Sequence, residues 1–309
     1  MQLNRDQLYF AYFMDCQTPQ KPGGGKDQTW DIAERAVRGI VELFAERGLT
    51  HCLGLCIEPE VCWQQADLFH EMADQGAWLA LHFQARGYRP HGATEDYPWD
   101  KTLAHYERDE QRELLRIARD DWEQALGRPV DTFGACCATA NDYTHPLLDE
   151  LGFRQCYTSV PGRYNPDWGQ RWWGAFPFSH HCSSKSRLVP GELEIYEVPH
   201  TRSLNPQPGT APGTWTVQDY RAEYEMDVAQ MLEIAVPFVE DMLRRDHPLL
   251  YLYAPTHNTW DVGDRTSGRR KAVENAIDTG YAVAEQFGLT LTPATLAEFH
   301  AEADRLGAY

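Results

Sequence analysis

Several polar residues of this sequence follow β-like runs at the point where each run ends. Asp15 follows an aromatic run in FMDCQ, His82 ends the run LALH, and His257 follows LYLYAPT. Asn141 and Asp142 come shortly after a fourth apolar run, TFGACC. On one face of a barrel, an Asp, two His and an Asn-Asp pair can together hold a metal ion, a water molecule and a substrate oxygen. These residue types therefore indicate a functional site at the strand ends.

Each of these residues also has a purely structural interpretation. Asp15 can be a solvated loop carboxylate, and His82 can be a hydrogen-bonded histidine of the core. Asn141 or Asp142 can cap a helix. His257 can be a loop histidine without a role. What favours a shared site is their common position at strand ends, because functional groups collect there in parallel α/β proteins.

The elements that must position these residues alternate between strand-like and helical patterns. Repeated strand–helix units predict parallel strands joined by right-handed crossovers. With this many units, a closed or nearly closed barrel is the simplest single-domain architecture, and a doubly wound open sheet is the alternative. The predicted strands are 7–14, 50–57, 77–83, 130–137, 153–160, 193–198, 249–254 and 289–291, and the predicted helices are 31–47, 67–75, 102–126, one from about 141 to 151, 217–245, 268–287 and 296–306.

Composition narrows the class of protein. The 309 residues hold 28 Lys and Arg against 46 Asp and Glu, a net charge of −18. This charge disfavours nucleic acid and anionic membrane surfaces as partners. No apolar run approaches the ~20 residues that span a bilayer, and the start lacks a signal-peptide pattern, so we expect a cytoplasmic protein. We expect one domain over 1–309, with an irregular insertion at 161–216 rich in Pro, Gly and Trp. The sequence does not indicate an oligomeric state.

The eight cysteines lie mostly in apolar runs, and no two form a CxxC pair. This spacing argues against a structural zinc site and predicts buried, reduced thiols. Cys136 and Cys137 follow a strand, but nothing pairs either thiol with a particular histidine as a nucleophile would require. The sequence has no GxGxxG motif after a strand, no P-loop and no GxSxG motif, which argues against a dinucleotide-binding fold, a P-loop NTPase and a serine hydrolase of the GxSxG type.

The order of the segments resembles the polysaccharide deacetylase, or NodB-homology, superfamily. FAYFMDCQ resembles its first motif, a strand ending in Asp that is followed closely by a second acid. ADQGAWLALHF resembles its second motif, DxGHExGxH, with Asp74, Gly76 and His82 in register. TFGACCATANDYTHPLLDELGF resembles the third motif, and THNTWD resembles the late motif that supplies a histidine. The resemblance covers roughly residues 8–160 and 248–295.

What the resemblance implies is a distorted (β/α) barrel that hydrolyses an N-acetyl group or a related amide of a carbohydrate or small molecule. Members of the family bind a divalent metal ion with one Asp and two His, and zinc is the metal that we expect. Carried over by position, Asp15 is the general base or the metal carboxylate, His82 is a metal histidine, and His257 is the late general acid.

The departures from the family pattern are at the metal ligands. Cys16 and Gln17 stand where the first motif carries its second acid, and Gln84 and Arg86 stand where another histidine is expected. An amide oxygen is a weaker ligand than imidazole, and a guanidinium repels a divalent ion. We therefore expect weak or no metal binding at this site.

If zinc were nevertheless held tightly, His181 or Asp142 would be the first candidates to complete its ligand set. The residues expected to contact the substrate are Gln17, Gln84, Arg86, Asn141 and Asp142.

Three hypotheses remain open. The first is a metal-dependent deacetylase with substitute ligands. The second is a metal-independent hydrolase of a small or cyclic amide, in which Asp15 and His257 do the acid–base work and Arg86 holds a carboxylate or the developing oxyanion. The third is a non-catalytic barrel that binds a carbohydrate or partner through loop tryptophans. Because Asp15, His82 and His257 occur together, we favour a hydrolase.

Overall fold

The strand β1 (Gln7–Cys16) is the centre of the main sheet, because it pairs in parallel with three other strands. One edge of β1 pairs with β12 (Tyr251–His257), and the other is shared between β2 (Leu53–Ile57) and β13 (Thr290–Pro293). The aromatic and apolar side chains of β1 are almost all buried, as in a central parallel strand covered on both faces. The computed structural model describes residues 6–19, 28–94 and 99–307.

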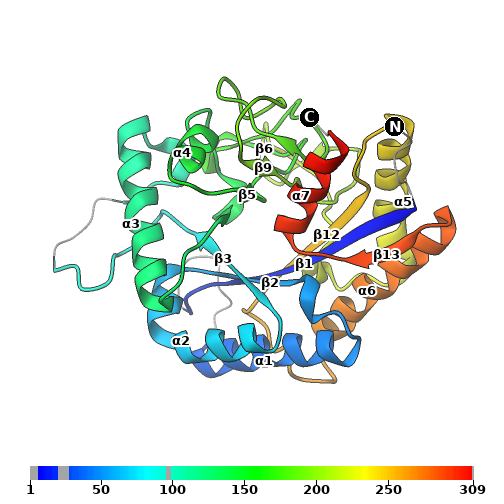
Figure 1. Cartoon of the computed structure of the whole chain (residues 1–309), viewed down its shortest axis with the longest axis horizontal. Coiled ribbons are helices and arrows are strands. Elements are labelled where there is room, and N and C mark those ends of the chain that lie inside the picture. Colours follow the sequence, from blue (N-terminus) through cyan, green and yellow to red (C-terminus); the bar gives the residue numbers. More distant parts are fainter. Residues whose placement is uncertain (1–5, 20–27, 95–98, 308–309) are drawn as a thin grey trace.

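The main sheet is curled into a half-barrel with helices on its outside (Figure 1). Its strand order is β12-β1-β2-β3-β4-β5-β9-β8, and all pairs along it are parallel except β8 with β9. This α/β architecture confirms the predicted distorted (β/α) barrel. The further strands of this sheet are β3 (Trp78–Phe83), β4 (Thr132–Ala135), β5 (Gln155–Cys156), β8 (His180–His181) and β9 (Tyr196–Glu197).

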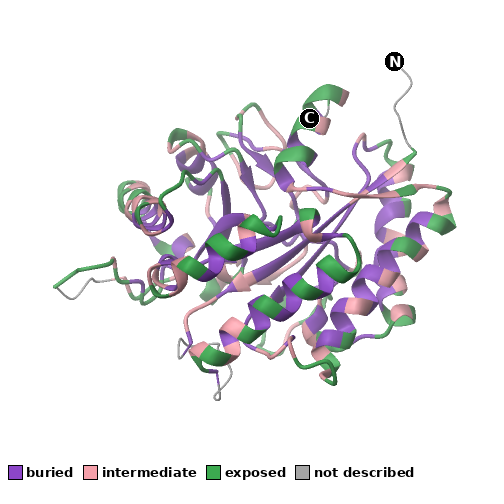
Figure 2. Ribbon diagram, turned by 60° about the horizontal axis from the view of Figure 1, so that its bottom comes forward, coloured by how far each residue is buried: buried purple, intermediate pink, exposed green. Residues whose placement is uncertain are grey.

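The helices cover the outer side of the sheet, with α1 and α2 along its lower border and α5 and α6 near β12 and β13 in Figure 1. Buried residues line the sheet and the helix faces turned toward it, and exposed residues lie on the opposite faces (Figure 2). The helices are α1 (Trp30–Glu46), α2 (Pro59–Asp74), α3 (Arg108–Leu126), α4 (Thr144–Glu150), α5 (Val228–Arg244), α6 (Gly268–Phe287) and α7 (Leu296–Leu306). Short 3-10 turns occupy Thr50–Cys52, Leu103–His105, Cys136–Ala138, Pro166–Trp168 and Ala222–Tyr224.

Three long helices differ from the sequence-based prediction at their starts. α3 begins at Arg108 rather than at 102, because Leu103–His105 forms a separate 3-10 turn and a capping box between Glu107 and Glu110 starts the helix. α2 begins at Pro59 rather than at 67, because proline is well suited to the first helical turn.

α5 begins at Val228 rather than at 217. Just before it, the Asp227 side chain accepts a hydrogen bond from the backbone N–H of Gln230, and the Gln230 side chain accepts one from the backbone N–H of Asp227. This capping box fixes the start of the helix.

The insertion at 161–216 is mostly irregular but holds a small antiparallel sheet of order β10-β11-β6-β7. Its strands are β6 (Tyr164–Asn165), β7 (Gln170–Arg171), β10 (Gln207–Pro208) and β11 (Trp215–Thr216). The insertion also supplies β8 and β9 to the main sheet. It is therefore joined to the barrel by strand pairing.

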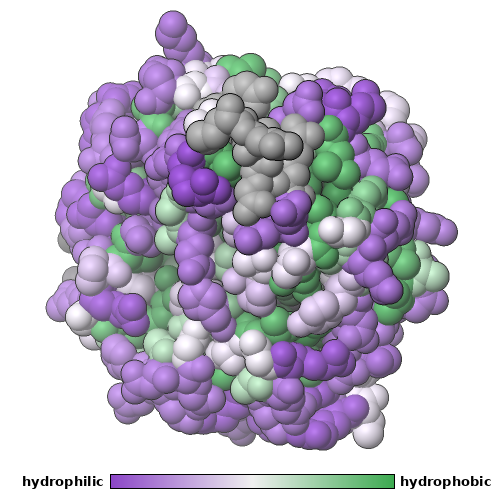
Figure 3. Space-filling model, turned by 45° about the vertical axis from the view of Figure 1, so that its right-hand side comes forward, coloured by the Kyte–Doolittle hydropathy of each residue, from purple (hydrophilic) through white to green (hydrophobic). Residues whose placement is uncertain are grey.

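Polar side chains dominate the molecular face shown in Figure 3, with apolar residues in smaller areas between them. This distribution is typical of a globular chain, and 24% of the residues of this chain are charged. Within the described part of the chain, every helix is too short or too polar to cross a lipid bilayer.

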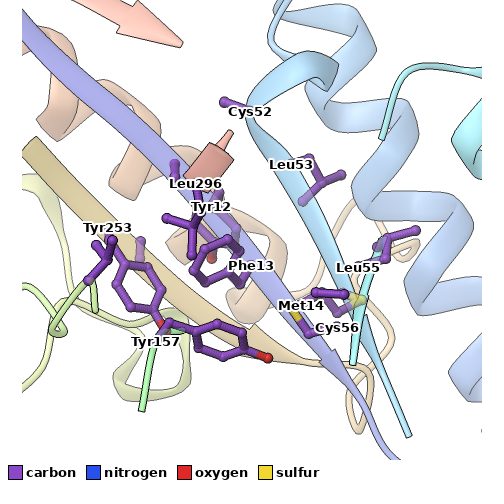
Figure 4. Close-up of a cluster of buried hydrophobic side chains, with 14 of the residues drawn as sticks. Tyr12, Phe13, Met14, Cys52, Leu53, Leu55, Cys56, Tyr157, Tyr253 and Leu296 are labelled. Carbon is purple, nitrogen blue, oxygen red and sulfur yellow. The ribbon is translucent and has the colours of Figure 1, made fainter. Parts of the chain in front are cut away.

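Aromatic rings fill the interior below the carboxyl ends of the strands. Phe13 lies 4.8 Å from Tyr157 and 4.4 Å from Tyr253 between ring centroids, and the three are close together in Figure 4. The Tyr157 ring lies across Gly134 of β4, where a β-carbon would come within 1.9 Å of the ring carbon Cζ. Glycine at this position is therefore what allows Tyr157 to occupy the interior.

We expect Gly134→Ala to lower the free energy of unfolding by about 1–3 kcal/mol, because the new methyl group overpacks the site and displaces the Tyr157 ring. Equilibrium denaturation measures the change. Gly280→Ala in α6 is the matched control, since its β-carbon meets Phe10 at an ordinary 3.4 Å. A Gly134→Ala variant as stable as this control would contradict the packing argument.

Candidate active site

Three of the predicted site residues meet at the carboxyl ends of β1, β3 and β12. Asp15 Oδ1 lies 3.2 Å from His82 Nδ1, and Asp15 Oδ2 lies 3.8 Å from His257 Nε2. The register of β1 with β12 places Asp15 directly beside His257. The carboxylate therefore lies between the two imidazoles, as the common strand-end position predicted.

A cavity of about 210 Å³ opens above this group. Asp15, Gln17 and His257 contribute to its wall, whereas His82 does not and is only 2% exposed. His82 therefore lies behind Asp15, with Nε2 at 3.5 Å from the side-chain nitrogen of Gln17. The remaining lining residues are Ala135, Cys136, Cys137, Ala138, Tyr157, Arg163, Gln170, His200 and Arg221.

The environment of Asp15 keeps its carboxylate charged. Burial alone would raise its pKa, but His82 and, to a smaller extent, His257 and His200 lower it to about 2. Burial also works against the charged form of His82, yet the adjacent Asp15 carboxylate raises the pKa of this histidine. The two groups thus stabilise each other's charged form. The Tyr157 hydroxyl lies 3.4 Å from Asp15 Oδ1 as a further donor.

Glu223 fixes the orientation of His257. Its Oε1 lies 2.8 Å from His257 Nδ1 and also accepts a hydrogen bond from the Thr256 hydroxyl at 3.0 Å. Burial would raise the pKa of Glu223, but the hydrogen bond to His257 and the nearby Arg221 charge lower it. With Nδ1 bound to a carboxylate, His257 presents Nε2 to Asp15 and to the cavity.

Two arginines bring positive charge to the cavity wall. The carboxylate of Asp219, which is fully buried, pairs with Arg163 at 2.8 Å and with Arg221 at 2.5 Å. Despite burial, these two cations and His200 hold the pKa of Asp219 well below its ordinary range. Arg221 also lies near the Glu223 carboxylate, so Arg163, which pairs with Asp219 alone among the described carboxylates, brings the less compensated charge to the cavity wall. Both guanidinium groups line the cavity and can donate hydrogen bonds to an anionic group there.

Cys137 and Ala138 adopt left-handed backbone conformations, with φ of 57° and 54°. Such strain persists only where the surroundings hold it in place. Here the insertion does so, because Gln170 donates to the carbonyl of Cys137 and Trp172 Nε1 donates to that of Ala138 at 2.7 Å. The hydrogen bond from Cys136 lowers the pKa of the Cys137 thiol against the effect of burial. Cys137 thus places a thiol on the cavity wall.

The other residues expected to contact substrate lie outside this cavity. Asn141 donates to the carbonyls of Ala104 and Tyr106, and Asp142 pairs with Arg187 at 2.7 Å. Both residues thus have structural partners near the start of α4.

Gln84 and Arg86 line a neighbouring pocket that shares Cys136 and Cys137 with the cavity. In the sequence interpretation, His181 is a candidate to complete a zinc ligand set, but its Nε2 lies 2.8 Å from Oδ1 of Asp304. It therefore does not reach Asp15.

The metal ion implied by the family resemblance does not fit this group of side chains. A divalent transition metal needs several ligand atoms around one point, and structural zinc takes four. Cys16 Sγ faces the carbonyl of Met14 at 3.5 Å, and the amide nitrogen of Gln17 faces His82. In the described ranges, two clusters bring three or more metal-ligating side chains together, and neither includes Asp15, His82 or His257.

Sequence reasoning missed several residues of the cavity. His200 follows β9 by three residues and Tyr157 follows β5 directly, so the strand-end criterion could have found both if those strands had been bounded correctly. Arg163 and Arg221 lie in irregular segments, and Glu223 lies in a 3-10 turn. Only the folded chain brings the two arginines to the cavity wall and Glu223 to His257.

Comparisons with known proteins show which solved structures share this fold. No protein-family model matches the chain, and no curated protein matches it significantly. Among solved structures, it resembles Puue allantoinase with a TM-score of 0.61 at 10% identity, covering 98% of this chain and 92% of that chain.

Two further solved structures carry the same similarity. A protein described as a polysaccharide deacetylase of Mycobacterium smegmatis gives a TM-score of 0.58 at 13% identity, over 98% of this chain and 92% of that chain. One from Pseudomonas aeruginosa PAO1, described likewise, gives 0.55 at 14% identity, over 96% and 91%. The chain therefore has the polysaccharide deacetylase fold.

Proposed function

We propose that this protein hydrolyses a non-peptide amide C–N bond of a small, anionic substrate without using a metal at Asp15. The observation that carries the proposal is the Asp15 carboxylate between His82 and His257 at the wall of the cavity. The allantoinase and deacetylase descriptions of proteins with this fold agree with hydrolysis of C–N bonds.

Asp15 is the general base in this proposal. It takes a proton from a water molecule in the cavity while the water oxygen forms a bond to the amide carbon. His82 does not line the cavity and acts by holding the Asp15 carboxylate in place and charged. Its role is therefore positioning.

His257 is the general acid. In its protonated form it donates from Nδ1 to Glu223 and keeps its second proton on Nε2, which faces the cavity. When the C–N bond breaks, that proton passes to the leaving nitrogen. The proton on Asp15 then returns to solvent, and His257 is protonated again for the next cycle.

Arg163 and Arg221 bind the substrate in this proposal. Both line the cavity and are held by the buried carboxylate of Asp219, so little side-chain entropy is lost when they bind an anion. Their charge also stabilises the oxyanion that forms when water adds to the amide.

Deacetylation of an N-acetylated carbohydrate is a second candidate. The rings of Trp173 and Trp215 lie 5.2 Å apart and are 52% and 38% exposed. Trp215 lines a pocket that shares Arg163 and Gln170 with the cavity. An aromatic surface beside the cavity suits a sugar ring, and it would equally suit a barrel that binds a carbohydrate without cleaving it.

The acid–base pair predicts the effect of two substitutions. Asp15→Asn and His257→Asn should each lower kcat by about 10²–10⁴, because each removes a proton-transfer group and keeps the approximate size. Activity is measured on a panel of N-acetylated sugars and of neutral and anionic cyclic amides. Asp109→Asn and His70→Asn, at exposed positions, are the matched controls. Activity within about twofold of wild type in both site variants would contradict these acid–base roles, whereas a wild type inactive on the whole panel would favour the binding-protein interpretation.

The pKa of Asp15 predicts a pH dependence. Because it lies near 2, below the ordinary 3.8, Asp15 stays ionised down to pH values near 2 and adds no acidic limb to kcat/KM above pH 4. Its contribution to folding stability is complete above about pH 4 and is lost as the pH falls toward 2.

In His82→Asn the main stabilising cation is gone while burial remains, so the acidic limb should move to higher pH. The pH profile of kcat/KM measures the shift, with circular dichroism at each pH to exclude unfolding. Identical acidic limbs in the variant and the wild type would contradict the assigned role of His82.

Positive charge on the cavity wall predicts substrate preference. Arg163→Gln should raise KM at least tenfold for an anionic amide and much less for a neutral analogue, since an ion pair worth more than ~1.4 kcal/mol is removed. Arg86→Gln is the matched comparison, because Arg86 lines the neighbouring pocket. If Arg86→Gln gave the selective loss and Arg163→Gln did not, the anion site would lie in that pocket instead.

A further inference from the structure

A second group of reactive side chains lies apart from the cavity. His145 of α4, Cys156 of β5, Cys182 directly after β8 and Glu197 of β9 converge at one point, and their ligand atoms all lie within 4.8 Å of one another. Each of the four residues is at most 1% exposed. None of them lines the cavity around Asp15.

Strand pairing holds three of these residues together. Cys156 pairs with Glu197 in the parallel register of β5 and β9, and the Cys182 N–H donates to the carbonyl of Ile195, two residues before Glu197. Successive side chains of a strand face opposite sides. Because Tyr157 points into the barrel toward Asp15, Cys156 points outward, to the side covered by α4.

The distances suit ligands around one ion. Glu197 Oε2 lies 3.2 Å from His145 Nε2 and 3.1 Å from Cys156 Sγ. Tetrahedral zinc with bonds of about 2.0–2.3 Å separates its ligand atoms by about 3.3–3.8 Å. The other oxygen, Glu197 Oε1, accepts from the Ser159 N–H at 2.9 Å, which fixes the carboxylate and leaves Oε2 facing the histidine and the thiol.

The chemistry of the four groups distinguishes a metal site from a buried ion pair. An ion pair needs only the histidine and the carboxylate, whereas two thiols at the same point add the ligands that zinc prefers. Two thiolates, one carboxylate and a neutral imidazole around Zn²⁺ give a formal charge of −1, the same as in the Cys₃His class. Charge balance therefore does not oppose binding of the ion.

We propose that His145, Cys156, Cys182 and Glu197 bind one zinc ion in a closed structural site. Four protein ligands, all buried, leave no open position for a water or substrate. The ion joins α4, β5 and β9 to the segment after β8, and so anchors part of the insertion to the main sheet. Binding releases the protons of the two thiols to solvent. This proposal does not depend on the proposed hydrolase activity.

The test is the metal content of the full-length protein, purified from medium supplemented with zinc and dialysed. We expect about one zinc per chain in the wild type and in Asp15→Asn/His82→Asn, and a loss of at least tenfold in Cys182→Ser. Cys52→Ser is the matched control, because Cys52 is buried but belongs to no such cluster in the described ranges. Zinc should be retained in this control.

Spectroscopy on the wild type keeps the proposal testable if Cys182→Ser fails to fold. X-ray absorption should show sulfur ligands at about 2.3 Å from zinc together with nitrogen or oxygen at about 2.0–2.2 Å. After removal of zinc by a chelator, reloading with Co²⁺ should give absorption from thiolate-to-metal charge transfer. Melting of the zinc-free protein should occur at a lower temperature, restored by added zinc.

Three results would overturn the proposal. Wild-type protein without zinc above trace level, with its thiols free or Cys156 joined to Cys182, would show a metal-free cluster. A zinc spectrum without sulfur ligands would exclude these cysteines. Zinc kept in Cys182→Ser and lost in Asp15→Asn/His82→Asn would place the metal at the active site and would contradict the metal-free mechanism as well, whereas loss of activity in Asp15→Asn alone bears only on the mechanism.

Discussion

The charge of one largely buried carboxylate, Asp15, is the constraint on which the candidate active site depends. Removing a carboxylate from water is costly unless opposite charges and hydrogen-bond donors surround it. Asp15 receives these from His82, His257 and the hydroxyl of Tyr157, which belong to or directly follow three different strands. The curled parallel sheet brings these strand ends to one edge. The fold and the chemistry of the cavity are thus linked through this one group.

Much of the barrel could be predicted from the sequence because its signals are local. The apolar strands around Asp15, His82 and His257 stand out by composition, and the bounds of α6 and α7 follow from hydrophobic periodicity and from the glycines that end them. The residues of the cavity wall were harder to predict from the sequence than the strands. Arg163 and Arg221 come from irregular segments, and Glu223 behind His257 comes from a 3-10 turn, so tertiary contacts alone determine where their side chains point.

The buried His145–Cys156–Cys182–Glu197 cluster illustrates the same limit. The absence of a CxxC pair argued against structural zinc, yet that rule assumes that neighbouring ligands come from one turn. Here each ligand comes from a different element, so sequence spacing carries no signal, and strand pairing creates the cluster. The strand-pairing register of short strands such as β5 and β9 is hard to read from sequence because each has only two residues.

The position of β1 at the centre of the sheet has a consequence for folding. Tyr9 pairs with Tyr251 of β12 and Thr292 of β13, so strands far apart in the chain must meet before the sheet is complete. Contacts between such distant residues slow folding, because a long loop must close before they form. During synthesis on the ribosome, the backbone groups on the edge of β1 that pairs with β12 stay unpaired until β12 has been made. Because β12 follows β1 to β9 in the chain, His257 meets Asp15 only after most of the chain has been synthesised.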